Sequence, residues 1–315
     1  MIHDSQQQYL RLGASLYVPA TRLDLTELAD GQRLGPLRSI IFCVEDAVRC
    51  GDVGMALENV QQLLDNLRPS ETQRFVRVRN PQTLARLLDM RGIDGVDGFV
   101  LPKVTHRNLI EYFDLLSSDS RYWLMPTLES AEAFDADAMR RLRGALESSG
   151  FRERVLALRI GGNDLLNLLH LRRGPRSTIY DTPLRQVIAT LATVFTPAGF
   201  HLTAPVFEGL SDGATLAREV DQDLEHGLYS KSAVHPEQLR WIESRYAVSR
   251  EDLEIAESVL DESAPAVFRM HDMMCEPATH RNWAKLVIER GRLFGIRDGR
   301  EHREPTRAFA RVVAP

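Results

Sequence analysis

Charged side chains stand where apolar segments of this chain end, and the first such place is the run SIIFCVEDAV (39–48). Its apolar residues lead directly into two adjacent carboxylates, Glu45 and Asp46. Inside a core, such a pair would cost on the order of several kcal/mol unless it were protonated or compensated by a cation. We therefore expect the pair to leave the core at the end of a strand, where cations can reach it.

Other charged residues stand at the ends of further apolar segments, and they are Arg22, Arg77, Arg79, Lys103, Glu129, Asp164, Lys231 and His235. A hard divalent cation such as Mg²⁺ prefers oxygen ligands and keeps several waters, so one or two carboxylates suffice to hold it. Glu129 and Asp164 can supply them from neighbouring strands. Gly161 and Gly162, just before Asp164, would let backbone N–H groups approach an anionic ligand closely.

The elements that must position these residues alternate along the chain. Strands are expected at 14–20, 39–45, 74–80, 98–104, 122–129, 155–162, 200–208 and 227–234. Helices are expected at 52–67, 81–91, 106–117, 131–148, 181–196 and 212–225. The alternation is typical of βα units with a parallel sheet, and eight strands favour a (β/α)₈ barrel of the TIM type over an open sheet. In such a barrel the ends of the strands meet at one rim, which would gather the charged residues.

The chain changes character near its C-terminal end. We expect the barrel to occupy residues 1–245 and a helical extension, with helices at 249–260 and 279–294, to occupy residues 246–296. The segment between these helices, 261–277, has an irregular pattern. A polar tail, 297–315, is expected to be partly disordered.

Composition excludes several classes of protein. Hydrophobic residues at 43% and charged residues at 26% are typical of a soluble globular chain, and the net charge of −5 argues against nucleic acid or an anionic membrane as the main partner. The N-terminal residues do not resemble a secretory signal, and no apolar stretch approaches the roughly 20 residues of a membrane span. The three cysteines form no CxxC motif, so a reducing cytoplasm is expected.

Seven short motifs together resemble one enzyme family. They are LYVPATR, CVEDAV, RVRN, LPKV, PTLES, GGNDLL and SKSAVHPEQ, and they occur in the order seen in the citrate lyase β-subunit-like branch of the HpcH/HpaI aldolases. The resemblance implies a TIM barrel with a C-terminal helical extension, Mg²⁺ or Mn²⁺ at the strand ends, and a homotrimer or homohexamer. It also implies cleavage or formation of a C–C bond beside a carbonyl, often on an acyl-CoA substrate.

The resemblance also assigns roles to individual residues. It implies that Glu129 and Asp164 are metal ligands and that Arg77 binds substrate and stabilises the developing enolate. Glu45 and Asp46 match an acid pair that lies near a water on the metal and near Lys231. The remaining expected contacts are Arg22, Lys103 and Gly162 to substrate, with Lys231 and His235 in support.

The chain departs from the family pattern at three places. Cys43 stands where the family usually has an aspartate, and RVRN leaves either Arg79 or Asn80 in place of the family's asparagine. Cys275 stands at the position of a C-terminal aspartate that is catalytic in relatives that make or hydrolyse acyl-CoA esters. These changes argue against thioester hydrolysis and place the chain nearer to a divergent subgroup of TIM-barrel C–C bond lyases.

Most of these residues also have a structural interpretation. Glu129 and Asp164 can be rim acids paired with arginine, Glu45 and Asp46 can cap the next helix, and His235 can simply open a helix with Pro236. Lys103 can be a charge at a strand end, and Cys275 a small core residue.

The sequence thus predicts a Mg²⁺-dependent C–C bond lyase acting on a hydroxy acid, a 2-oxo acid or its acyl-CoA ester. The sequence does not identify the general base, and a water on the metal held by Glu45 or Asp46 is the preferred choice. Two alternatives remain open. The chain can be a catalytically impaired small-molecule-binding protein of the same fold, or a lyase subunit that needs an acyl-carrier partner.

Overall fold

The computed structural model describes residues 8–31, 33–34, 37–117 and 120–297. The chain divides into two compact units, Met1–Tyr246 and Ala247–Pro315, and each is described by itself. The polar tail predicted at 297–315 lies outside the described residues except for Arg297. Within the described ranges, no helix combines the length and the apolar character that crossing a membrane requires.

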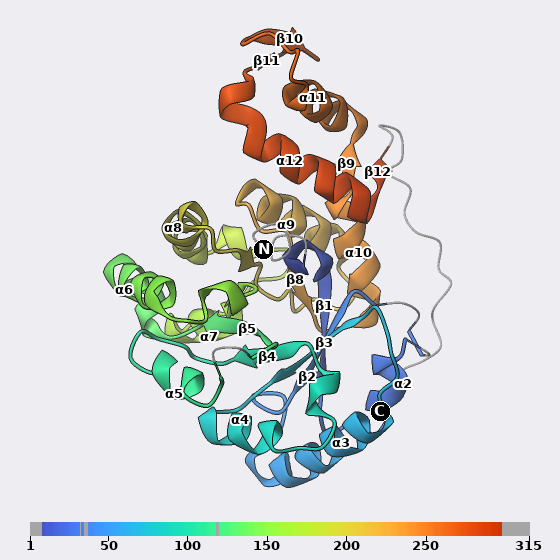
Figure 1. The fold of residues 1–315 in the computed structure, drawn as a ribbon, viewed down its shortest axis with the longest axis vertical. Helices are drawn as coiled ribbons and strands as arrows, with labels where there is room; N and C mark the ends of the chain where they lie inside the picture. Colours follow the sequence, from blue (N-terminus) through green and yellow to red (C-terminus); the bar gives the residue numbers. More distant parts are fainter. Residues whose placement is uncertain (1–7, 32, 35–36, 118–119, 298–315) are drawn as a thin grey trace. The chain divides into compact units, whose positions relative to one another are not determined.

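Eight parallel strands form the centre of the first unit (Figure 1). They are β1 (Ala14–Pro19), β2 (Ser39–Cys43), β3 (Gln73–Arg77), β4 (Gly98–Leu101), β5 (Trp123–Leu128), β6 (Leu158–Ile160), β7 (Leu202–Thr203) and β8 (Lys231–Ala233). Their spatial order is β7-β6-β5-β4-β3-β2-β1-β8, and a parallel bridge between Ala204 and Lys231 joins the two ends. The predicted TIM-type barrel is confirmed, and every strand overlaps a predicted segment.

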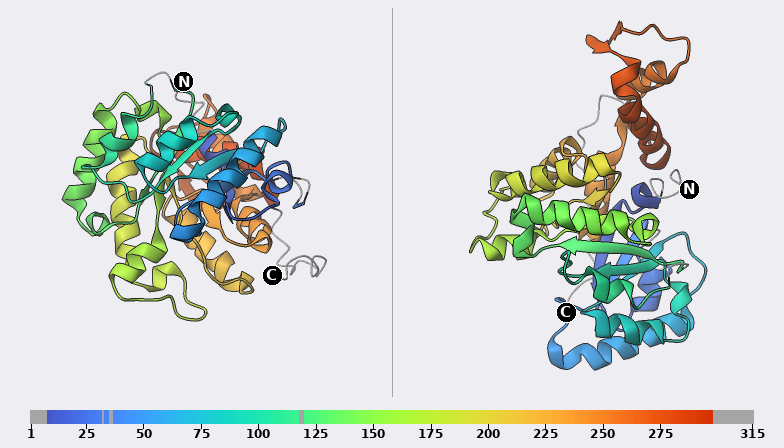
Figure 2. Two further views of the ribbon diagram at one scale, coloured as in Figure 1. Left: turned by 90° about the horizontal axis from the view of Figure 1, so that it is seen from below. Right: turned by 60° about the vertical axis from the view of Figure 1, so that its left-hand side comes forward.

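Helices cover the outside of these strands, as Figures 1 and 2 show. They are α2 (Leu25–Ala29), α3 (Val53–Asn66), α4 (Pro81–Leu88), α5 (Leu109–Phe113), α6 (Ala136–Ser148), α7 (Gly162–Leu168), α8 (Leu184–Phe195), α9 (Gly213–Glu225) and α10 (Pro236–Tyr246). Helix α3 shows why such segments fold as they do, because Leu57, Val60 and Leu64 recur at helical spacing and are all buried. The six predicted segments do not include α2, α7 or α10. Helices α2 and α7 are too short for a period to emerge, whereas the start of α10 agrees with the interpretation that His235 and Pro236 open a helix.

The interior of the barrel is partly polar. Side chains alternate across a strand, so one face of each strand points inward and the other packs against the helices. Arg159 of β6 points inward, since its Nη2 donates to Ser232 Oγ of β8 at 2.7 Å. The Ser39 hydroxyl of β2 donates a hydrogen bond to the Ser15 hydroxyl of β1, with the two oxygens 2.8 Å apart. Polar groups therefore occupy the barrel below its rim.

The second unit has a small apolar core of its own. Its elements are β9 (Val248–Ser249), α11 (Arg250–Leu260), β10 (Phe268–Met270), β11 (Met273–Cys275), α12 (Pro277–Phe294) and β12 (Ile296–Arg297). The predicted helices at 249–260 and 279–294 are present. The expectation of an irregular connection is wrong in part, because β10 and β11 pair as an antiparallel hairpin. Cys275 lies in the core beside Ala256 and Val287, as the small-core-residue interpretation predicts.

Candidate active site

The adjacent carboxylates follow β2 and take part in one group of charged side chains at the barrel rim. Glu45 is buried, whereas the Asp46 side chain is 57% exposed. Burial raises the pKa of Glu45 above its usual range, and a hydrogen bond with Asp46 adds to this rise. Burial alone would also raise the pKa of Asp46. The hydrogen bond from Glu45 and the nearby cations Lys103 and Arg77 outweigh burial, so the pKa of Asp46 is lowered.

Arg77, the last residue of β3, connects three of the carboxylates. Its Nη2 lies 2.8 Å from Glu45 Oε2, 3.3 Å from Asp46 Oδ2 and 2.9 Å from Glu129 Oε1. The side chain is only 11% exposed. Burial opposes the charged form of Arg77, but Tyr17, Glu129 and Glu45 around it prevail and its pKa is raised. Arg77 is therefore held as a cation by the three carboxylates around it.

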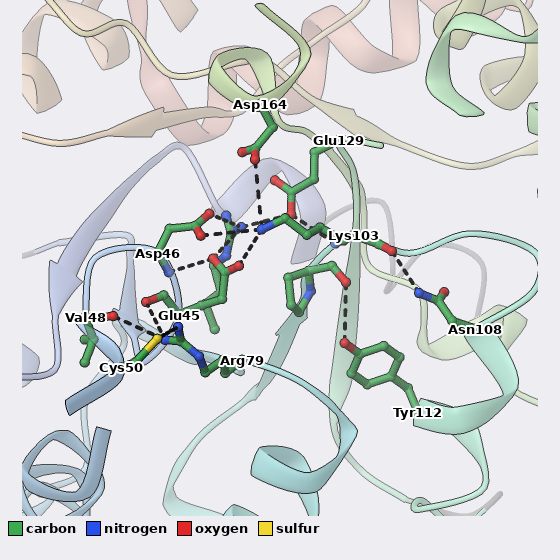
Figure 3. A network of polar contacts seen from close by, with 12 residues as sticks. Glu45, Asp46, Val48, Cys50, Arg79, Lys103, Asn108, Tyr112, Glu129 and Asp164 are labelled. Carbon is green, nitrogen blue, oxygen red and sulfur yellow. Dashed lines mark hydrogen bonds and ion pairs between the residues drawn. The ribbon is translucent and has the colours of Figure 1, made fainter. Parts of the chain in front are cut away.

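Lys103 follows β4 and connects the other side of the group (Figure 3). Its φ of 50° is unusual for a residue with a side chain, and this turn points its N–H at Glu129 Oε1, 3.0 Å away. The ammonium reaches Glu45 Oε1 at 2.7 Å, Asp46 Oδ1 at 3.4 Å and Asp164 Oδ1 at 3.9 Å. Backbone strain at this one residue thus directs two donors into the site.

Glu129 and Asp164 face the same space from the end of β5 and from α7 (Figure 3). Glu129 is 2% exposed, and its burial raises the pKa to about 7, with Arg77 acting in the opposite direction and Asp164 adding to the rise. Its Oε2 is buried and has no hydrogen-bond partner among the described residues. A buried carboxylate oxygen without a partner is costly, so this atom points to a missing cation or proton.

Gly161 packs directly against Glu129. A Cβ placed on Gly161 would lie 2.3 Å from Glu129 Cβ and 2.4 Å from Glu129 Oε2, so only glycine fits there. The Gly161 N–H donates to Leu128 O at 3.1 Å, and the expected close approach of backbone N–H groups to an anionic ligand stays a prediction. Gly162 begins α7 and packs against Pro205. The glycines thus bring α7, and Asp164 with it, close to Glu129.

The charges of this group do not balance. Four carboxylates (Glu45, Asp46, Glu129 and Asp164) share two cations (Arg77 and Lys103), which leaves two negative charges when all are ionised. One divalent cation would neutralise them. No three His, Cys, Asp or Glu side chains of the described part form a ready metal cage. The residues therefore fit a cation that two carboxylates hold and that keeps other positions open.

Two of the predicted residues lie elsewhere. Arg22 pairs with Asp24 at 2.7 Å and not with the four carboxylates. Lys231 does not lie near Glu45 and Asp46, because it is fully buried and its Nζ bonds two carboxylates of α9. Strand alternation explains the difference, since the neighbouring Ser232 points inward to Arg159 and Lys231 therefore points outward.

His235 opens α10, as its structural interpretation predicts. Its N–H donates to Gln238 Oε1 at 3.2 Å, and its Nδ1 accepts from Glu237 N at 3.3 Å. These bonds satisfy backbone groups at the start of a helix. The supporting role of His235 in catalysis stays a prediction.

The RVRN motif supports the loop after β2 and caps a helix. Arg79 Nη1 donates to the backbone oxygens of Glu45 and Val48, each at 3.2 Å, so it holds the segment that carries the acid pair. Figure 3 shows Arg79 below this segment, next to Cys50. Asn80 caps α4 by accepting from Thr83 N at 2.8 Å.

Sequence reasoning missed two residues of the barrel interior, Tyr17 and Arg159. The arginine carbon Cζ lies 5.3 Å from the centre of the Tyr17 ring. A signal was present for Arg159, because a charged residue inside the apolar segment VLALRIGG needs either an inward polar partner or an anion. No comparable signal marks Tyr17, since aromatic residues are common in strands.

Fold and site together define a TIM-type barrel whose rim carries an acidic group suited to a divalent cation. The chain belongs to the family described as C–C bond lyase of the TIM-barrel fold, whose model matches residues 6–296. A curated relative, the citrate lyase subunit beta of Leuconostoc mesenteroides subsp. cremoris, is 23% identical over 235 residues, covering 70% of this chain and 73% of that protein.

Solved structures show the same fold. CitE of Mycobacterium tuberculosis, in complex with magnesium, acetoacetate and coenzyme A, is 19% identical with a TM-score of 0.64, covering 89% of this chain and 98% of that one. The citrate lyase beta subunit of M. tuberculosis with oxaloacetate and magnesium is 20% identical with a TM-score of 0.57, covering 75% and 98%. RipC of Yersinia pestis is 20% identical with a TM-score of 0.54, covering 75% and 95%.

Proposed function

We propose that this protein is a Mg²⁺-dependent C–C bond lyase that acts on a hydroxy acid or 2-oxo acid, free or as an acyl-CoA ester. The observation that carries the proposal is the uncompensated acidic group at the rim, with a buried Glu129 oxygen that lacks a partner among the described residues. Membership of the C–C bond lyase family supports the reaction class. The magnesium and the oxo acids held by structural neighbours support the cofactor and the substrate class.

Glu129 and Asp164 are the residues that would hold the cation. When bound, a divalent cation supplies Lewis-acid stabilisation of negative charge on a substrate oxygen. Asp164 is partly exposed, with 34% of its side chain open, and Glu129 is buried. This difference lets one carboxylate anchor the site while the other stays accessible from the rim.

Arg77 would bind the substrate anion and stabilise the charge of the enolate as the C–C bond breaks. Its guanidinium already faces three carboxylates, and a planar fork of donors suits a carboxylate or enolate oxygen better than an ammonium does. Lys103 is 47% exposed and would support the same charge from the other side.

A base must also remove the hydroxyl proton in the cleavage direction. We assign this to Glu45, acting through a water molecule, because its raised pKa makes it the better proton acceptor of the adjacent pair. The Asp46 carboxylate, which is more exposed and has a lowered pKa, would stay ionised and orient that water.

Thioester hydrolysis is not part of the proposal. The resemblance places Cys275 where relatives with that activity carry a catalytic aspartate, and here the residue is 1% exposed in an apolar core. A carboxylate there would have to be buried among aliphatic side chains. C–C bond cleavage alone is the activity that the residues support.

A subunit that needs an acyl-carrier partner is the second candidate, since the curated relative is named as a subunit of citrate lyase. The binding-protein alternative rests on the changes at Cys43 and Cys275. Cys43, at a position where the family usually has an acid, is 3% exposed and has a pKa raised by burial. Partners that co-elute from the native host would support the subunit. Ligand binding without turnover would support the binder.

The test is release of pyruvate, glyoxylate, acetate or oxaloacetate from a panel of hydroxy acids and their CoA esters, with and without Mg²⁺. We expect Glu129→Gln to abolish both turnover and the thermal stabilisation by Mg²⁺, since the amide keeps the size but loses the charge. Glu132→Gln, three residues along the chain and outside the acidic group, is the matched control. Unchanged Mg²⁺ stabilisation in Glu129→Gln would overturn the ligand assignment.

A further inference from the structure

A buried arginine lies in the barrel with no carboxylate of the described residues beside it. Arg159 is 2% exposed, its Nη2 donates to Ser232 Oγ at 2.7 Å, and its Nη1 lies 3.6 Å from Met125 Sδ. In the described part of the chain no carboxylate comes within 4.0 Å of its guanidinium. Burying a charge without a counter-ion is costly, so an interior guanidinium of this kind suggests an anion that arrives with the substrate.

The strand neighbours of Arg159 add further polar groups at the same level. Thr127 and Thr203 are in register with Arg159 on either side, and they are 2% and 0% exposed. Neither hydroxyl oxygen has a hydrogen-bond partner among the described residues. Glu129 follows Thr127 by two residues, so this polar layer lies about 6.6 Å below the acidic group.

Tyr17 connects this layer with Arg77. Its ring stacks over the Arg159 guanidinium at 5.3 Å, which holds the ring in one place. Tyr17 is in register with Ile41 of β2, and Ile41 with Phe75 of β3, so Tyr17 lies on the inward face two residues below the level of Arg77. Tyr17 is partly exposed. A phenol donor therefore lies on the inward face of the barrel below Arg77, at the base of the acidic group.

We propose that Tyr17 contacts the substrate, donating a hydrogen bond to a carboxylate oxygen beside Arg77, and that Arg159 is the positioning residue for Tyr17. This inference rests on the proposed function and defines its substrate more closely. A divalent cation would neutralise the acidic group. The positive charge of Arg159 beneath that group would then favour the binding of one carboxylate of the substrate. The site therefore selects an acid with a free carboxylate rather than a neutral carbonyl compound.

The experiment measures binding of oxaloacetate and of pyruvate by calorimetry in the presence of Mg²⁺. We expect Tyr17→Phe to weaken both affinities roughly tenfold, because it removes one hydrogen bond to a charged group. The affinity for Mg²⁺ alone should stay unchanged. Tyr112→Phe is the matched control, since its hydroxyl already donates to Pro102 O.

Arg159→Met tests the positioning role. We expect the same loss of acid binding as in Tyr17→Phe and no further loss in the double variant, since both changes remove one shared interaction. A purely structural role for Arg159 would lower the melting temperature but would give additive losses of affinity. If Arg159→Met does not fold, Tyr17→Phe still decides the inference.

The outcomes separate the two proposals. If the wild type binds the acids and Tyr17→Phe binds them equally well, the inference is wrong and the proposed function stands. If the wild type binds neither acid with Mg²⁺ present, the proposed function is wrong for these acids and the inference fails with it.

Discussion

Two groups of charged residues in the barrel unit differ in balance and exposure. The rim group has four carboxylates and two cations, and several members reach solvent. A second group joins β8, α9 and the segment before α8, and its fully buried Lys231 lies 2.8 Å from Glu219 Oε1 and 2.9 Å from Asp223 Oδ2. Arg173 bonds the other Glu219 oxygen at 2.6 Å, and Tyr180 donates to Asp223 at 2.7 Å.

The difference shows what distinguishes a site from a support. In the buried group, Glu219 and Asp223 face the two cations Lys231 and Arg173, and both oxygens of each carboxylate have partners. The partly exposed Glu208 adds a third carboxylate at the edge of the group, 3.8 Å from Arg173 Nε. The rim group keeps an excess of negative charge and an orphaned Glu129 oxygen within the described residues. A closed group whose carboxylate oxygens all have partners connects elements of the fold, whereas an open group with excess negative charge is suited to binding a cation and a substrate.

The largest expected effect comes from breaking the buried group. Lys231→Met would leave Glu219 and Asp223 short of one cation in a fully buried position. We expect the free energy of unfolding to fall by about 3–5 kcal/mol, measured by urea denaturation. Mg²⁺ should still stabilise the variant. A loss of Mg²⁺ binding without a loss of stability would mean that Lys231 belongs to the site after all.

Arg77→Lys tests the rim group, where we expect the change to affect activity more than stability. The ammonium keeps the charge but cannot donate to three carboxylates and a substrate oxygen at once. We expect turnover to fall on the order of 10²–10³-fold, measured as kcat on any acid that the wild type cleaves. Stability should change much less than in Lys231→Met. A variant with full activity would exclude Arg77 as the residue that stabilises the enolate.

The raised pKa of Glu129 predicts how pH affects cation binding. Its pKa of about 7 lies above the unfolded value, so between roughly pH 4.5 and 7 the folded protein holds a proton that the unfolded chain has lost. The metal-free protein should therefore lose stability as pH rises through this window. A cation competes with that proton, so stabilisation by Mg²⁺ should grow as pH rises through about 7. Melting temperatures with and without Mg²⁺ measure this, and Glu129→Gln should remove the dependence.

The smallest effect is expected at Asp46. Its side chain is exposed, so Asp46→Asn should change the free energy of unfolding by less than about 1 kcal/mol. Removing one of the four negative charges should nevertheless weaken Mg²⁺ binding, which titration calorimetry can measure. Asp137→Asn, another exposed acid paired with an arginine, provides the control. Equal Mg²⁺ affinity in both variants would show that the net charge of the rim group does not contribute.

Local patterns explain which parts of the fold could be predicted. All eight strands were visible because each buried run is bounded by turn residues and followed by an amphipathic segment. The β10–β11 hairpin was missed because Phe268–Met270 and Met273–Cys275 are short and enclose a turn with two non-glycine residues, His271 and Asp272, at positive φ. Turn chemistry there does not follow the usual glycine preference.

The sequence by itself determined the alternation of strands and helices and the gathering of Glu45, Asp46, Lys103, Glu129 and Asp164 at one rim, because parallel strands end on the same side of a barrel. Only the tertiary structure decided which charges meet. Lys231 and Ser232 are adjacent in the chain, but one faces α9 and the other faces Arg159. Successive side chains point to opposite faces of a strand, and a shift of one residue exchanges them, so partners follow from register and not from position in the sequence.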